Sequence, residues 1–101
     1  MASEPADAFV GKWKVFIGSY TAGFIWNCIK VDPTILLCNG RNDQEKKLHV
    51  NGNEVRVQRK YQGRWLPRTQ PHDIGHLEGW EIQFQKFKMV KQGNPTFIGI
   101  S

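Results

Sequence analysis

The stretch that decides the fold is KKLHVNGNEVRVQRKY, residues 46–61. Two runs of alternating apolar and polar residues flank Asn51-Gly52-Asn53. Alternation with a period of two is typical of a strand with one buried face, and Asn-Gly is the strongest short signal for a hairpin turn. Two registers are open: a two-residue turn pairs Leu48 with Val55, and a four-residue loop pairs Val50 with Val55. Both place the apolar side chains of the hairpin on one face.

Strand patterns recur on both sides of this hairpin. Predicted strands cover residues 12–20, 24–31, 35–38, 46–50, 55–61, 80–90 and 96–100, and residues 63–66 extend or restart the fifth. We expect a long loop over residues 67–79 and a β-bulge near Gln85-Lys86, where the alternation changes phase. Pro5 favours a helical turn over residues 5–9. The fold class is therefore all-β, a small antiparallel β-barrel or sandwich of about seven or eight short strands with a short N-terminal helical turn.

Length and composition fit that class. The chain has 101 residues, 40% of them hydrophobic, so we expect one β domain over residues 1–101, with residues 1–10 as an arm or helical turn. Lys and Arg number 14 against 9 Asp and Glu, a net charge of +5. No apolar run approaches the ~20 residues of a membrane span, and the first residues lack a secretion signal. We therefore expect a cytoplasmic protein without a membrane partner.

The two cysteines are placed to meet. If residues 24–31 and 35–39 pair around Asp32-Pro33-Thr34, Cys28 lies directly opposite Cys38. A cross-strand disulfide is compatible with that placement but strained. Reduced thiols packed as small hydrophobic groups are the favoured alternative, because no export signal is present.

The segment Phe9-Val10-Gly11-Lys12-Trp13-Lys14-Val15 resembles the opening of fatty-acid-binding proteins and the Gly-x-Trp signature of calycin barrels. Arg68-Thr69-Gln70-Pro71 followed by Trp80 is similar to a fragment of avidin-type barrels. The resemblance implies a meander barrel in which Trp13 closes one end around a small ligand. The two-helix lid of fatty-acid-binding proteins has no counterpart here, and Val15 stands where avidin-like proteins carry an amide for biotin. A calycin-like binder of a small apolar ligand is accordingly the third functional hypothesis.

Motifs for catalysis are missing from the sequence. It contains no Gly-x-Ser-x-Gly, no P-loop and no dinucleotide fingerprint. His72-Asp73-Ile74-Gly75-His76 brings two histidines near an aspartate, but Pro71 and Gly75 predict a loop with no fixed ligand geometry. We therefore predict a non-catalytic binding module that uses no cofactor and no metal.

Glycan binding is the first functional hypothesis. A sugar needs an aromatic ring for its C–H face and planar amides, carboxylates or arginines for its hydroxyls. Trp13, Trp26 and Trp80 lie in predicted strands and are expected in the core, which leaves Trp65 at the surface. A homo-oligomer would raise the avidity of such a weak site. The predicted ligand-binding residues of this lectin-like protein are Arg64, Trp65, Arg68, Gln70, His72 and Asp73.

Single-stranded nucleic acid is the alternative partner. Residues 56–68 combine five positive side chains with Tyr61 and Trp65, which suits phosphates and stacked bases. A solvated strand face opposite Val55 and Val57 explains much of the same charge. The residues that carry this alternative are Arg56, Arg59, Lys60, Tyr61, Arg64 and Trp65.

Overall fold

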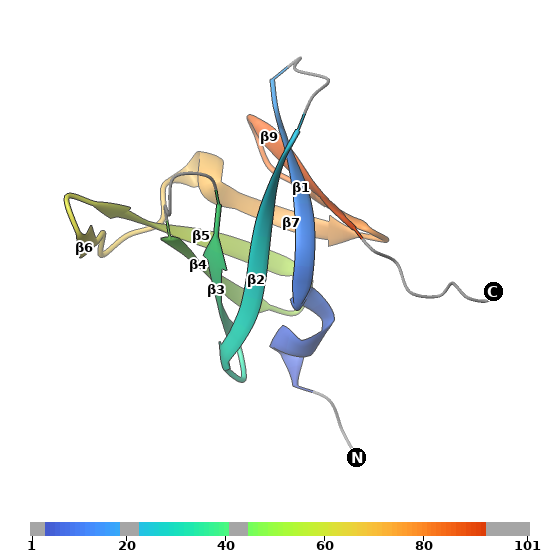
Figure 1. The fold of residues 1–101 in the computed structure, drawn as a ribbon, viewed down its shortest axis with the longest axis horizontal. Coiled ribbons are helices and arrows are strands. Elements are labelled where there is room, and N and C mark those ends of the chain that lie inside the picture. Colours follow the sequence, from blue (N-terminus) through green and yellow to red (C-terminus); the bar gives the residue numbers. More distant parts are fainter. Residues whose placement is uncertain (1–3, 19–22, 41–44, 93–101) are drawn as a thin grey trace.

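The computed structural model describes residues 4–18, 23–40 and 45–92 (Figure 1). Its elements in chain order are η1 (Pro5–Phe9), β1 (Gly11–Ile17), β2 (Phe24–Asp32), β3 (Ile35–Asn39), β4 (Glu45–Asn51), β5 (Glu54–Tyr61), β6 (Arg64–Trp65), η3 (Pro71–Asp73), β7 (Ile74–Glu78), β8 (Glu81–Gln83) and β9 (Phe87–Lys91). Both η elements are 3-10 helices. The predicted strand at 96–100 lies outside the described residues, as do residues 19–20 at the end of the first predicted strand.

Eight strands form a closed antiparallel barrel. Their order is β4-β3-β2-β1-β9-β8-β7-β5, and β5 also pairs with β4. Each strand therefore pairs with the strands before and after it in this order. The pairing of β1 with β9 joins the first and the last of the described strands and closes the ring. β6 is an extra strand that folds back onto the end of β5 and projects from the barrel (Figure 1). The predicted all-β fold is confirmed, and of the two predicted architectures the barrel is the one formed.

The β4–β5 hairpin adopts the second of the two predicted registers. Val50 pairs with Val55 and Asn51 with Glu54, so Leu48 lies opposite Val57 rather than Val55. Gly52 has a φ of 62°, a left-handed conformation that glycine adopts without a steric penalty. The predicted apolar face of the hairpin is buried, as expected for either register.

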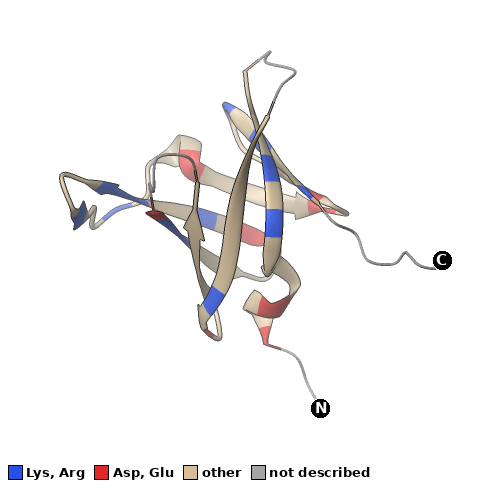
Figure 2. Cartoon of the chain, viewed as in Figure 1, with Lys and Arg blue, Asp and Glu red and all other residues tan. Residues whose placement is uncertain are grey.

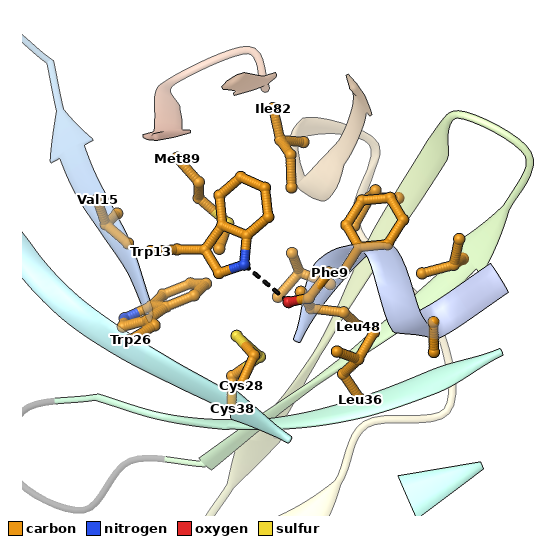
Figure 3. Packing of buried hydrophobic residues seen from close by; sticks show 14 of the residues in the cluster. Phe9, Trp13, Val15, Trp26, Cys28, Leu36, Cys38, Leu48, Ile82 and Met89 are labelled. Carbon is orange, nitrogen blue, oxygen red and sulfur yellow. Dashed lines mark hydrogen bonds between the residues drawn. A yellow bond between two sulfur atoms is a disulfide. The ribbon is translucent and has the colours of Figure 1, made fainter. Parts of the chain in front are cut away.

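One end of the barrel is closed by η1 (Figure 3). This turn contacts β2, β3 and β4 and buries Ala6 and Phe9, which confirms the predicted helical turn over residues 5–9. The indole N–H of Trp13 donates a hydrogen bond of 2.8 Å to the carbonyl oxygen of Phe9, so the buried donor is satisfied. The interior around it is filled by Val15, Leu36, Leu48, Val55, Val57, Ile82 and Met89.

Cys28 and Cys38 form a disulfide between β2 and β3 (Figure 3). The predicted cross-strand pairing is confirmed, because the two residues face each other in the register. The preference for reduced thiols is wrong for this structure. Both side chains point into the barrel and are 1% exposed, at a Cα–Cα distance of 4.1 Å that brings their sulfurs together.

The predicted loop over residues 67–79 is wrong in its second half. Residues 71–73 form η3, and Ile74–Glu78 form β7, which pairs with β5 and β8. Gly75 faces inward, where a Cβ atom would lie 2.6 Å from the carbonyl oxygen of Gln83. An inward glycine between Ile74 and His76 gives no apolar alternation. The strand is therefore formed by its neighbours rather than by a local pattern.

The predicted strand over residues 80–90 is two strands. The change of phase near Gln85-Lys86 marks a turn between β8 and β9, not a β-bulge. The backbone N–H of Phe84 donates to the carbonyl oxygen of Phe87 across it, and the two rings stack at 4.2 Å. Trp80 lies in the turn between β7 and β8 and is 56% exposed, so its predicted place in the core is wrong.

The described elements also bear on membrane insertion. No helix within residues 4–18, 23–40 and 45–92 is long and apolar enough to cross a membrane.

Gly75→Ala is expected to lower the free energy of unfolding by about 1–3 kcal/mol, because the added methyl group overpacks the contact between β7 and β8. His76→Ala on the outer face of the same strand is the matched control, with a change within about 0.5 kcal/mol. Urea unfolding followed by tryptophan fluorescence measures both. Equal stabilities of the two variants would contradict the close approach at Gly75.

Candidate functional site

The predicted sugar-binding residues are spread over three places. Arg64 and Trp65 form β6, and Arg68 lies in the segment that follows it. Gln70 precedes η3 and accepts a hydrogen bond from the backbone N–H of Asp73, while His72 lies within η3. Only some of the six predicted residues therefore lie where a single ligand could contact them together.

Asp73 points into the barrel and is 1% exposed. Its two carboxylate oxygens accept hydrogen bonds from Arg59, at 2.7 Å from Nε and 2.9 Å from a terminal nitrogen. Such a bidentate pair satisfies a buried carboxylate. Asp73, predicted for the sugar, and Arg59, predicted for nucleic acid, thus bind each other instead of facing outward.

A second cation lies beside this pair inside the barrel. Lys46 is 7% exposed, faces Arg59 across the β4–β5 ladder, and has its ammonium 4.8 Å from the centre of the Trp26 ring. Burial lowers the pKa of Lys46, and repulsion from Arg59 lowers it further, while Asp73 opposes the shift. This end of the barrel therefore holds two inward cations and one carboxylate. Sequence alternation in β4 places Lys46 inward with Leu48, which was a signal for it.

The outer surface of β4 and β5 carries the opposite set of side chains. Because the strands alternate, Lys47 and His49 of β4 lie beside Arg56, Gln58 and Lys60 of β5. Figure 2 shows basic residues along β5, on β6 and in the segment after it. We call this surface the basic face, and it consists of Lys47, His49, Arg56, Gln58, Lys60, Trp65 and Arg68.

Trp65 lies on the basic face between two lysines. The ammonium of Lys47 is 4.5 Å from the centre of a Trp65 ring, and that of Lys60 is 4.8 Å away. Both distances are those of cation–π contacts. Lys60 also forms an ion pair of 2.6 Å with Glu45. A sugar that stacked on Trp65 would have to compete with these ammonium groups.

A hollow of about 570 Å³ lies next to Trp65 on the same face. β4 and β5 supply its floor through His49, Arg56 and Gln58, and the chain after β6 supplies its wall through Pro67, Arg68 and Thr69. The guanidinium of Arg56 is 3.1 Å from Glu54 through Nε. The basic lining makes the hollow suited to an anion.

A hydrogen-bond chain fixes the floor of this hollow. The side-chain amide of Gln58 donates 2.7 Å to the carbonyl oxygen of Leu66. Its oxygen therefore faces Nε2 of His49 at 2.8 Å and accepts a hydrogen bond from it. The sequence-based predictions named Arg68 for a sugar and Arg56 for nucleic acid, but missed Lys47, His49, Gln58 and Thr69. Alternation in residues 46–50 could have placed Lys47 and His49 on the face of Arg56.

In the described part of the chain, the two histidines of the 72–76 segment do not lie together with other side chains that could bind a metal ion. His72 Nε2 is 3.9 Å from Asp73, and His76 is exposed on the outer face of β7. In the described ranges, no three His, Cys, Asp or Glu side chains are grouped closely enough to hold a metal ion.

Asp73→Asn is expected to lower the free energy of unfolding by about 1–3 kcal/mol, because it removes the charge-assisted pair with a partly exposed Arg59. Glu54→Gln, which breaks the surface pair with Arg56, is the control, and its change should stay within about 0.5 kcal/mol. Chemical unfolding of both variants measures the difference. An Asp73→Asn protein as stable as Glu54→Gln would contradict the structural role of Asp73.

Lys46 predicts a pH dependence of stability. Its pKa in the folded protein lies below the ordinary 10.5, so the unfolded chain binds the proton more tightly. The free energy of unfolding therefore rises with pH between the folded and the unfolded pKa of Lys46. Lys46→Met removes this contribution. In urea unfolding from neutral pH to about 10, the parent protein should gain stability relative to Lys46→Met. A difference that stays constant over this range would contradict the assignment.

No family model, curated protein or solved structure matches this chain. The residues of the barrel and its basic face are accordingly the basis for inferring its function.

Proposed function

We propose that the protein binds single-stranded nucleic acid through the basic face. The observation that carries the proposal is the placement of Trp65 against Lys47 and Lys60 on an open strand surface, at 4.5 and 4.8 Å. Aromatic rings between cations suit a single strand, because bases stack on the rings while phosphates meet the cations. Tyr61, which is 64% exposed, pairs with Arg64 on the opposite face of the β5–β6 hairpin from Lys60 and Trp65, so the ring that carries the proposal is that of Trp65.

The charge of this surface supports the same partner. Its lysines and arginines are four: Lys47, Arg56, Lys60 and Arg68. In the described part of the chain, the carboxylates that pair with them are Glu45 and Glu54. Positive charge therefore remains in excess on a surface that also presents the ring of Trp65. Neutralising phosphates on such a surface releases counterions, which drives binding at low salt.

Sugar binding draws less support from the same contacts. A neutral sugar would make no use of the excess positive charge beside Trp65, and Asp73 is engaged by Arg59. A calycin-like apolar ligand would need space in an interior that Trp13, Leu48 and Met89 fill at 0–1% exposure. Both hypotheses remain predictions from the sequence.

The proposal predicts salt-sensitive binding of a labelled thymidine oligonucleotide of about 10 nucleotides. In fluorescence anisotropy titrations, the logarithm of the binding constant should fall linearly with the logarithm of the salt concentration, with a slope of about −0.7 for each phosphate contacted. Trp65→Ala should weaken binding about tenfold or more, because each stacked base contributes roughly 1–3 kcal/mol.

Trp80→Ala and Lys12→Gln are the matched controls. Trp80 is exposed in the β7–β8 turn and Lys12 lies on the outer surface of β1, so both should bind the oligonucleotide as the parent protein does. Absence of an anisotropy change at about 50 mM salt, where counterion release is strongly favourable, would refute nucleic-acid binding. A hit on a glycan array that is insensitive to salt would support the lectin-like hypothesis instead.

A further inference from the structure

The hollow beside Trp65 differs from the rest of the basic face in its side chains. Around Trp65 the cations are lysines, whereas the hollow is lined by Arg56 and Arg68 together with His49. Arginine presents a planar fork that binds two oxygens of one phosphate, whereas lysine acts as a point charge. This part of the surface is therefore suited to holding one phosphate in a defined orientation.

The donors of the hollow are free to meet an anion. The ion pair of Arg56 with Glu54 uses Nε, and within the described ranges no carboxylate lies within 4.0 Å of Arg68. His49 donates through Nε2 to Gln58, which orients its ring at the edge of the hollow. Thr69 adds a hydroxyl to the lining.

We propose that this hollow binds a terminal phosphate group of the nucleic acid, that is, a phosphomonoester. The inference rests on the proposed function for the polymer, but it assigns a separate group to a separate set of residues. A phosphomonoester carries close to two negative charges near neutral pH and three terminal oxygens. An internal phosphodiester carries one charge and two free oxygens. Two arginines and a hydroxyl match the dianion better than the monoanion.

The position of the hollow suits the end of a nucleic-acid strand. Leu66, Pro67 and Arg68 follow Trp65 directly, and the carbonyl oxygen of Leu66 is held by Gln58 on the floor. In the proposed arrangement a base stacks on Trp65 and its terminal phosphate contacts Arg68, three residues farther along the chain. The segment at residues 67–69 walls the hollow, and a continuing chain would have to pass around it.

The test compares one oligonucleotide in three forms, with hydroxyl groups at both ends, with a 5′-phosphate or with a 3′-phosphate. At least one phosphorylated form should bind the full chain about tenfold more tightly than the hydroxyl form, as expected for charge-assisted hydrogen bonds. In Arg68→Gln and Arg56→Gln this ratio should fall close to one. Lys12→Gln removes the same charge from the far side of the barrel and should keep the tenfold ratio.

A direct arm uses inorganic phosphate and follows the ring resonances of His49 by NMR. They should shift in the parent protein and stay unchanged in Arg68→Gln. Equal binding of all three oligonucleotides, or a ratio that survives in both arginine variants, would overturn the terminal-phosphate site while leaving nucleic-acid binding intact. If no oligonucleotide binds, the proposed function fails. A His49 shift with inorganic phosphate would then still support the anion site, and its absence would overturn the site as well.

Discussion

The buried carboxylate of Asp73 is the constraint on which the binding surface depends. A carboxylate that is 1% exposed needs a charged partner, and Arg59 supplies it in bidentate form. Arg59 also accepts a hydrogen bond from the backbone N–H of Leu66 through its carbonyl oxygen. One residue of β5 therefore fastens the segment after β6 at two points. Residues 67–69 are held beside the outer surface of β4 and β5 because both ends of the segment are tied down.

The alternation of β5 directs its charged side chains to the two opposite faces of the strand. Val55, Val57 and Arg59 face the interior, while Arg56 and Lys60 face outward from the same strand. A cluster that looks uniform in the sequence thus serves two purposes. Lys46, opposite Arg59, adds a second inward cation, and its lowered pKa shows that burial disfavours its charged form. The attraction between its ammonium and the Trp26 ring offsets part of that cost.

Local patterns predicted the elements whose pairing partners are close in the chain. The hairpin around Gly52, the pairing of Cys28 with Cys38 and the turn from Pro5 are all of this kind. β7 was not predicted because one of its inward residues is Gly75, a position where the close approach of β8 leaves no room for an apolar side chain. The hollow was not predicted for a related reason. His49 and Arg68 are far apart in sequence, and only the β4–β5 pairing and the Asp73 contact bring them together.

The hollow is built from two parts of the chain, the paired strands β4 and β5 and the segment after β6, and each part contributes differently. His49 and Arg56 stand directly opposite each other on paired strands of a closed barrel, so their spacing is fixed by the hydrogen-bond ladder. Arg68 comes from an irregular segment whose position depends on the Asp73 ion pair and on Gln58. The strands therefore set where an anion can sit. The segment sets how tightly it is enclosed, because it adds Arg68 to the residues that the paired strands supply. The interior packed around Trp13 supports this difference between the strands and the segment, because a close-packed core holds the strands around it in place.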